Sequence, residues 1–397
     1  MKLRSLRVSG YKNLADCQVP MRDFNVVVGP NNSGKSNLLD LFRMLRFLWR
    51  YEPDLVLATQ RHGDHLSIEI GVTFEAGIDG ETWTVDYDAA VKRSGHGEIG
   101  FESEVLKAKQ AARTGPAKTF LRRDGATFAV GNRRPHPISP LTSAVSAASI
   151  LYPASAGNAG ELPVVIQEME ALARTSVFAL SPVALRNALD KDVMVREGRV
   201  SAVGLLPLLD RISQDRKKWL LFEQTVCDIL DLDDIDFRVI PEDRSRPRGR
   251  EGSPGTRARF CSLWGPNDRC DRLADYSDGT LIVVALVALM VERDPVGELT
   301  CIEELENCLH PAAQAELLRF LKDNSSRWQV MITTHSPYLV NGVDPDDLLV
   351  AVVGDDGLSS FRKPDDRKAV NDLLKHGYMS FGDLMVTNFR EVIRAKD

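Results

Sequence analysis

The order of apolar and polar positions predicts an α/β chain that opens with short strands. Apolar side chains gather in Leu3–Val8, in Cys17–Pro20 and in Asn25–Val28, with turn-forming residues between these stretches. The third stretch is almost continuously apolar, which indicates a buried strand. After Gly34 the apolar positions recur every three or four residues as far as Leu48, so this strand should lead through a loop into a buried helix.

In the middle of the chain, the spacing of apolar positions changes several times. Apolar and polar residues alternate through Leu66–Val85 around turn residues at Gly77–Gly80, which is typical of a β-hairpin. Gly, Pro, Ser and Ala dominate Thr114–Gly160, so we expect mostly loop with short elements there. Helical spacing returns in Leu205–Leu232 and predicts one or two amphipathic helices, without the sustained heptads of a coiled coil.

The last third alternates helices and strands. We expect helices at Thr280–Glu292 and Pro311–Lys322, and strands at Leu299–Ile302 and Val330–Thr333. Ahead of this part, residues 244–259 combine many arginines with Gly and Pro and few apolar side chains, which predicts an exposed, mobile loop.

Composition and charge narrow the classes of protein. The chain has 397 residues, 43% of them hydrophobic and 27% charged, which suits globular domains with sizeable cores. Its net charge of −6 argues against a uniformly basic nucleic-acid binder. The longest apolar run, Leu281–Val291, is too short to span a membrane and the N-terminus has no apolar signal core, so we expect a cytoplasmic protein with no membrane partner. Six cysteines without a CxxC pair predict reduced thiols.

The clearest motif is a glycine-rich phosphate loop. Residues 29–36 read G-P-N-N-S-G-K-S and fit the pattern G-x-x-x-x-G-K-[ST], between the predicted buried strand and the predicted helix that the motif requires. The glycines let backbone N–H groups surround a phosphate, and the helix N-terminus adds a favourable field. We therefore expect a bound nucleotide, with Lys35 on the β- and γ-phosphates and Ser36 on Mg²⁺. The residues expected to contact the nucleotide are Gly29, Pro30, Asn31, Asn32, Ser33, Gly34, Lys35, Ser36 and Asn37.

Two acids and a histidine follow later buried strands. Glu303 and Glu304 directly follow Leu299–Ile302, where a metal carboxylate and a residue that polarises water belong in a phosphoryl-transfer site. We expect Glu303 to hold Mg²⁺ and Glu304 to act on the attacking water. His335 follows the next strand and is a candidate γ-phosphate contact, although a lone histidine is more often structural. The candidate catalytic residues are Lys35, Glu304 and His335.

Taken together, these motifs resemble the ABC-type ATPases, and within them the RecF/SMC-like branch that includes the OLD family and related phage-defence ATPases. The similar segments are the first strand and turn at Leu6–Leu14, Walker A at Gly29–Ser36, a Ser-Asp-Gly-Thr signature within Asp275–Leu281, Walker B and D-loop at Cys301–Pro311, and the H-loop at Thr334–Pro337. Two positions depart from the family pattern, since Glu303 replaces an aspartate and Leu305 replaces a frequent proline. Neither Gln110 nor Gln167 is a firm candidate for the Q-loop glutamine.

The resemblance implies an ABC-type P-loop NTPase fold. Residues 1–110 would form the first ATPase lobe with a β-rich subdomain, residues 111–272 an insert and helical lobe, and residues 273–397 the rest of the ATPase core. It also implies a homodimer with composite sites, in which Ser277 and Gly279 of one protomer close over the ATP bound by the other. Turnover could be slow because Glu303 is one methylene longer than aspartate.

The sequence leaves three functions open. The first is an ATP-driven switch in phage defence that controls a separate effector, such as a nuclease encoded nearby, because the stretch after His335 is shorter than a typical nuclease domain. The second is a DNA-repair or DNA-tethering ATPase, and the third is a scaffold that hardly hydrolyses ATP. Direct DNA binding would use arginines in two groups: Arg244, Arg246, Arg248, Arg250, Arg257 and Arg259, and then Arg122, Arg123, Arg133 and Arg134.

Several aspartates near the C-terminus could suggest a second metal site. They occur in the sequences V-D-P-D-D and G-D-D-G, which are typical of turns, so we interpret them as turn residues. These aspartates are Asp344, Asp346, Asp347, Asp355 and Asp356.

Overall fold

The computed structural model describes residues 2–50, 67–78, 80–93, 99–131, 133–138, 165, 175–191, 205–240, 258–265, 269–292 and 298–364. The chain forms two compact units. The first comprises residues 1–177, 295–304 and 324–397, and the second comprises residues 178–294 and 305–323. The expected three-segment division of the sequence stays a prediction.

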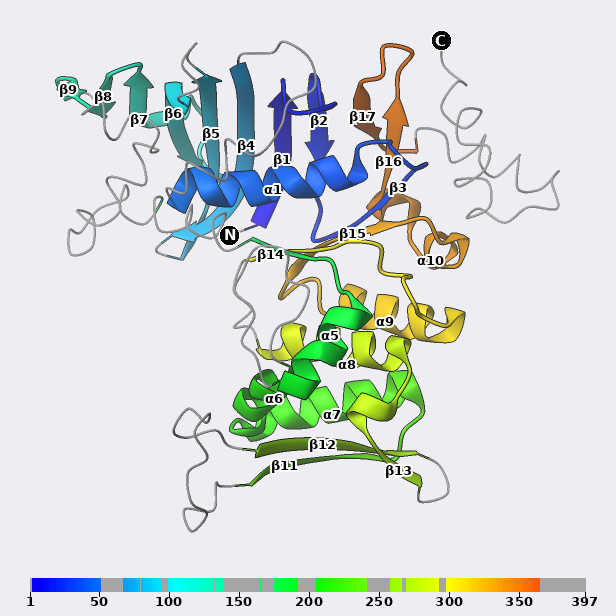
Figure 1. Ribbon diagram of the computed structural model, residues 1–397. Helices are drawn as coiled ribbons and strands as arrows, with labels where there is room; N and C mark the ends of the chain where they lie inside the picture. Colours follow the sequence, from blue (N-terminus) through cyan, green and yellow to red (C-terminus); the bar gives the residue numbers. More distant parts are fainter. Residues whose placement is uncertain are drawn as a thin grey trace, which may run out of the picture. The chain divides into compact units, whose positions relative to one another are not determined.

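An eight-stranded antiparallel sheet dominates the first unit (Figure 1). Its strand order is β2-β1-β4-β5-β6-β7-β8-β9, so the predicted hairpin of β4 and β5 lies inside the sheet. The strands are β1 (Lys2–Ser9), β2 (Cys17–Pro20), β4 (Ser67–Ile78), β5 (Glu81–Arg93), β6 (Ile99–Gln110), β7 (Lys118–Asp124), β8 (Thr127–Val130) and β9 (His136–Pro137). The last three strands give residues 114–138 more regular structure than the sequence predicts, because short strands can extend an existing sheet edge.

A second, six-stranded sheet has the order β10-β14-β15-β3-β16-β17. Strands β14, β15, β3 and β16 run parallel to one another, and β17 is antiparallel to β16. These strands are β3 (Phe24–Val28), β10 (Ser176–Phe178), β14 (Leu299–Ile302), β15 (Gln329–Thr334), β16 (Leu348–Val353) and β17 (Ser359–Arg362). Every residue of β3, β14 and β15 is buried, which agrees with the continuous apolar runs of parallel strands.

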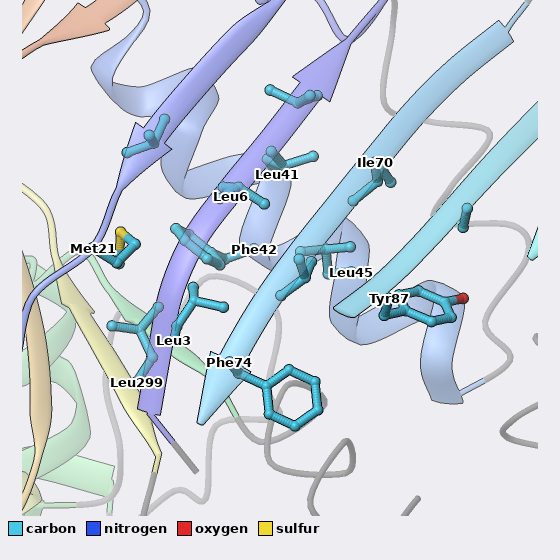
Figure 2. Packing of buried hydrophobic residues seen from close by; sticks show 14 of the residues in the cluster. Leu3, Leu6, Met21, Leu41, Phe42, Leu45, Ile70, Phe74, Tyr87 and Leu299 are labelled. Carbon is cyan, nitrogen blue, oxygen red and sulfur yellow. The ribbon is translucent and has the colours of Figure 1, made fainter. Parts of the chain in front are cut away.

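Helix α1 (Lys35–Arg50) supplies apolar side chains to the core of the first unit. Leu41 and Phe42 lie beside Leu3 and Leu6 of β1 in Figure 2, and all four are at most 1% exposed. The same core includes Leu299 of β14 and further residues of the parallel strands. Because α1 begins directly at the phosphate loop, this packing fixes the position of the loop.

The second unit is a helical bundle around α8 (Asp278–Glu292), in which every residue from Leu281 to Val291 is buried. Helices α5, α6 and α7 pack on it, so the long apolar run is explained by a helix enclosed by others. The surrounding helices are α5 (Pro182–Lys191), α6 (Leu205–Ser213), α7 (Arg216–Leu230) and α9 (Pro311–Asp323). In the described part of the chain, no helix is long and apolar enough to cross a membrane.

A three-stranded antiparallel sheet that the sequence analysis did not predict completes the second unit. It consists of β11 (Asp234–Ile240), β12 (Ala258–Gly265) and β13 (Arg269–Arg272). Most of the predicted arginine loop at 244–259 lies outside the described residues, and Arg259 belongs to β12, opposite Val239. The remaining short elements within the described residues are η2 (Leu273–Asp275), α10 (Pro337–Asn341) and η3 (Pro345–Asp347).

Candidate nucleotide-binding site

A cavity of about 690 Å³ in the first unit brings together most of the predicted site residues of that unit. Its walls come from the phosphate loop, the β1–β2 turn, the ends of β14 and β15, and the β16–β17 turn. The lining residues are Lys12, Asn13, Asn31, Asn32, Ser33, Gly34, Lys35, Ser36, Asn37, Glu304, Thr333, His335, Val353 and Gly357. Because β3, β14, β15 and β16 are parallel, their carboxyl ends meet at one edge of the sheet, which is where ligands bind in such folds.

Two positions of the phosphate loop have no space for a side chain, so only glycine fits there. A Cβ on Gly29 would come within 2.7 Å of the Ala351 carbonyl oxygen, and a Cβ on Gly34 within 2.6 Å of Ser359 Oγ. Gly34 has φ of +90°, and Asn32 has φ of +64°. This sequence of left-handed conformations lets successive backbone N–H groups turn to one side and form an anion-binding concavity. The loop therefore fits a phosphate group.

The side chain of Lys35 is held in place by backbone carbonyl groups of the phosphate loop. Its Nζ donates to the carbonyl oxygens of Gly29 and Pro30, each at 2.8 Å, and the residue is 6% exposed. An ammonium that donates to two fixed carbonyls is positioned in advance, so little side-chain entropy remains to be lost on binding an anion. This arrangement suits the phosphate contact expected from the sequence.

A side-chain network braces the loop from the β1–β2 turn. Asn13 Nδ2 donates to Ser359 Oγ at 2.6 Å, and Asn37 Nδ2 donates to Asn13 Oδ1 at 2.5 Å. The Ser359 N–H in turn donates to the Asn13 carbonyl at 2.8 Å. Asn13 therefore ties the start of α1 to β17. Asn13 was not among the predicted site residues, although its place in the predicted first turn was a signal.

Glu304 has an unusual backbone conformation for a non-glycine residue. Its φ is +50°, and its N–H donates to the Thr333 hydroxyl at 3.0 Å. The left-handed region costs a non-glycine residue about 1 kcal/mol or more, and such residues cluster at functional sites. His335 lies close by, with 4.0 Å between its Nε2 and Glu304 Oε1, which is beyond a hydrogen bond. The three side chains thus share one wall of the cavity.

Glu303 lies beside α1 and is not among the residues that line the cavity. Its Oε2 is 3.8 Å from Arg43 Nη2, and Arg43 also pairs with Asp40, to which Lys12 donates at 2.6 Å. Burial of Asp40 raises its pKa, but the hydrogen bonds and charges of Lys12 and Arg43 outweigh burial and lower the pKa overall. The role of Glu303 as a metal ligand stays a prediction.

The predicted signature segment belongs to the second unit. Ser277 is exposed and caps α8, since its Oγ accepts from the Thr280 N–H at 3.2 Å. A Cβ on Gly279 would lie 2.5 Å from the carbonyl oxygen of Cys308, so only glycine fits between α8 and the segment after Walker B. Cys308 itself has φ of +61°. The signature and the predicted D-loop are therefore packed tightly within one unit.

Several other sequence expectations can be placed. The prediction that Arg123 belongs to an exposed basic patch is wrong. Its side chain is fully buried against Glu104, and its Nη1 donates to Glu104 Oε2 at 3.2 Å. Its neighbour Arg122 is exposed, as are Arg133 and Arg134. Successive residues of a strand point to opposite faces, which the Arg-Arg dipeptide could not show. The arginines Arg244, Arg246, Arg248, Arg250 and Arg257 lie outside the described residues.

The C-terminal aspartates form turns, as the sequence predicts. Asp344 caps η3 and accepts from the Asp346 N–H at 2.9 Å, and Asp356 accepts from the Leu358 N–H at 3.0 Å. Gln110 ends β6, whereas Gln167 lies outside the described residues. The cysteines with described side chains, namely Cys17, Cys227, Cys261, Cys301 and Cys308, are free thiols, which agrees with the expectation.

Two family models match separate parts of the chain. Residues 1–114, which contain the phosphate loop, match the family described as "AAA ATPase domain". Residues 272–341, which contain the signature, Walker B and His335, match the family described as "AAA domain, putative AbiEii toxin, Type IV TA system". No curated protein matches the sequence significantly.

The fold is similar to solved structures of SMC head domains. An SMC head bound to the C-winged helix domain of ScpA has a TM-score of 0.51 at 13% identity, covering 94% of this chain and 100% of that chain. The SMC head of Thermotoga maritima has a TM-score of 0.46 at 16% identity, covering 92% and 100%. A third SMC head, with an extended coiled coil and bound to the C-terminal domain of ScpA, derived from Pyrococcus furiosus, has a TM-score of 0.48 at 12% identity, covering 94% and 99%. The chain therefore has the P-loop ATPase fold of SMC heads, and its residues 1–114 and 272–341 match family models of AAA-type ATPase domains.

Proposed function

We propose that this chain is a Mg²⁺-dependent ATPase that works as a dimeric switch and controls a separate effector protein in phage defence. The observation that carries the proposal is the cavity in which the phosphate loop, Glu304 and His335 meet. A phosphate loop with glycines at two crowded positions, a fixed lysine and a carboxylate in the same cavity are the parts that phosphoryl transfer to water requires.

The roles of the residues in hydrolysis follow from their positions. The backbone of the loop and Lys35 would hold the β- and γ-phosphates, and Ser36 would hold Mg²⁺, which neutralises phosphate charge when bound. Glu303, which does not line the cavity, would contact the Mg²⁺ through a water molecule. Glu304 would orient the attacking water and accept its proton, because it lines the same cavity as the phosphate loop. His335, 4.0 Å from that carboxylate, would contact the γ-phosphate side of the site.

The dimer is the second part of the proposal. Ser277 is exposed at the N-terminus of an apolar helix, where a hydroxyl and the positive end of the helix suit an anion. We place the ATP of one protomer under the Ser277 and Gly279 of its partner, so that each dimer has two composite sites. ATP then acts as the link between protomers, and hydrolysis separates them. The match of residues 272–341 to the AbiEii-type family supports the proposed link to phage defence, and the separate effector is part of the proposal.

The proposal is tested with the purified chain by equilibrium ATP binding and by light scattering. Wild-type protein should bind ATP and form dimers only with ATP and Mg²⁺. Lys35→Ala should lose ATP binding, because it removes the cation at the phosphates. Ser277→Arg should keep ATP binding and lose dimerisation. The matched control is Ser213→Arg, which places the same cation at another exposed serine of the second unit and should dimerise normally. Wild-type ATP affinity in Lys35→Ala would refute the assignment of the cavity.

A further inference from the structure

We propose that Arg186 is a positioning residue that holds the signature segment, Asp275–Leu281, in the conformation that closes the nucleotide site of the other protomer. The inference rests on the proposed composite site and adds a residue about 90 positions away in sequence, on α5, whose spacing gives no hint of this role. All the groups involved belong to the second unit.

The guanidinium of Arg186 contacts two residues of the signature segment and the residue directly before it. Nη1 donates to the Ala274 carbonyl at 2.7 Å, and Nη2 donates to the Tyr276 carbonyl at 2.7 Å. Nε and Nη2 both donate to Asp278 Oδ1, at 3.0 and 2.8 Å. One planar fork therefore fixes two backbone carbonyls and a carboxylate within five residues. Only arginine presents donors in this rigid arrangement.

Other contacts hold the same segment from outside α5. The Tyr276 hydroxyl donates to the Leu263 carbonyl of β12 at 3.1 Å, and Leu273 is 1% exposed. Ser277 caps α8 through the Thr280 N–H, and Gly279 abuts the Cys308 carbonyl. The turn is thus anchored on each side of Ser277 while the Ser277 side chain itself is exposed. Arg186 supplies the anchor on the N-terminal side, where the segment is a short 3₁₀ turn and has few hydrogen bonds of its own.

Charge gives a second reason for an arginine here. Asp278 immediately follows Ser277, and its carboxylate would repel a triphosphate brought to Ser277 by the other protomer. The repulsion between charges a few ångströms apart is substantial at a partly desolvated interface. Arg186 bonds this carboxylate directly and offsets the repulsion, and the carboxylate in turn favours the positive N-terminus of α8. Loss of Arg186 should therefore weaken closure through both geometry and charge.

The first test uses three single variants. Arg186→Met keeps the aliphatic stem and removes the fork, and Arg186→Lys keeps the charge without the fork. The matched control is Arg211→Met, because Arg211 pairs with Glu292 at the opposite end of α8, at 2.9 Å. Arg186→Met should bind ATP as wild type does and form ATP-dependent dimers about tenfold more weakly, as expected for lost charge-assisted hydrogen bonds. The dimer affinity of Arg186→Lys should lie between those of Arg186→Met and wild type, and Arg211→Met should dimerise as wild type does.

The decisive test is capture of mixed dimers, in which a tagged chain retains an untagged one in the presence of ATP. The reference pair is tagged Lys35→Ala with untagged Ser277→Arg, which contains one intact composite site. Arg186→Met should be captured by Lys35→Ala as efficiently as Ser277→Arg is, because the intact signature comes from the tagged chain. Capture of Arg186→Met by tagged Ser277→Arg should be about tenfold weaker, since neither chain then supplies a normal signature.

Each other outcome overturns a defined part of the account. Equal capture of Arg186→Met by Ser277→Arg would show that the signature works without Arg186. Failure of folded Arg186→Met with Lys35→Ala would show that Arg186 acts on its own phosphate loop. Failure of the reference pair would refute the composite site, and the inference with it. If Arg186→Met does not fold, Arg186→Lys, which keeps the charge and removes the fork, is assayed in the same pairs and must give the same order of capture efficiencies.

Discussion

The N–H of Glu304 donates to the hydroxyl of Thr333 at 3.0 Å, and this bond holds Glu304 in the left-handed region, at φ of +50°. Thr333 is 1% exposed and is the last residue but one of β15, which pairs with β14, so its hydroxyl has little freedom to move. The proposed general base thus depends on a neighbour that the sequence analysis treated only as part of a strand.

Thr333→Val should separate catalysis from binding. Valine keeps the shape of threonine but accepts no hydrogen bond, so the Glu304 N–H loses its partner and the strained backbone can relax. We expect kcat to fall about tenfold, the loss expected for roughly one hydrogen bond, while ATP affinity stays the same. Thr333→Ser keeps the hydroxyl and should restore most of the rate. Equal rates for the Val and Ser variants would show that the hydroxyl does not position Glu304.

Glu304→Gln should bind ATP and fail to hydrolyse it. The amide fills the same space, but it cannot accept a proton from water, and general-base catalysis contributes roughly 10²–10⁴-fold. Rapid-quench measurement of one turnover, with bound ATP counted in parallel, gives both quantities. The comparison variant is Glu303→Gln, which should instead raise the Mg²⁺ concentration needed for hydrolysis. A normal rate in Glu304→Gln would move the proton-accepting role to another residue.

Asp40 should contribute stability that depends on pH. Lys12 and Arg43 lower its pKa in the folded protein below the unfolded value of about 3.9. A lowered folded pKa adds stability above the unfolded pKa, and this stability is lost as pH falls through the folded pKa. Asp40→Asn should therefore reduce the free energy of unfolding by about 1 kcal/mol at pH 7, because the pair is partly solvated. The difference should shrink below about pH 4. Asp355→Asn, at an exposed turn, should show no such trend in denaturant titrations across this range.

The buried pair of Arg123 and Glu104 should matter far more than any surface pair. Tyr87 also donates to Glu104, at 2.8 Å, so removal of Arg123 leaves a carboxylate buried with only part of its partners. We expect Arg123→Met to cost about 3–5 kcal/mol of unfolding free energy, and the adjacent exposed Arg122→Met less than about 0.5 kcal/mol. Equal effects of the two substitutions in urea titrations would contradict the buried placement of Arg123.

The sequence predicted the elements that carry continuous or periodic apolar patterns. Strands β3, β14 and β15 and helices α1, α8 and α9 all lie where these patterns place them, because a buried strand or helix face leaves a local signal. The phosphate loop could be predicted equally well, because its glycines are required by steric limits within the loop itself. Motifs that depend on local backbone geometry are therefore accessible from sequence alone.

Features that depend on distant partners were missed. The sheet of β11, β12 and β13 joins strands across residues 241–257, and neither strand pairing nor register leaves a mark at one position. The opposite burial of Arg122 and Arg123 depends on the register of β7, and the fork of Arg186 depends on how α5 packs. Likewise, Glu303 follows its strand as expected, but its position beside Arg43 comes from the packing of α1.

The central claim is that two protomers share each ATP site, and ATP hydrolysis by mixed variants tests it most directly. Lys35→Ala and Ser277→Arg should each be inactive alone, the first without bound ATP and the second without a closing signature. When they are mixed, the Ser277→Arg chain supplies an intact phosphate loop and the Lys35→Ala chain supplies an intact signature, so one complete site forms in each mixed dimer. The account predicts that hydrolysis returns on mixing. Hydrolysis at the wild-type rate by Ser277→Arg alone would contradict it.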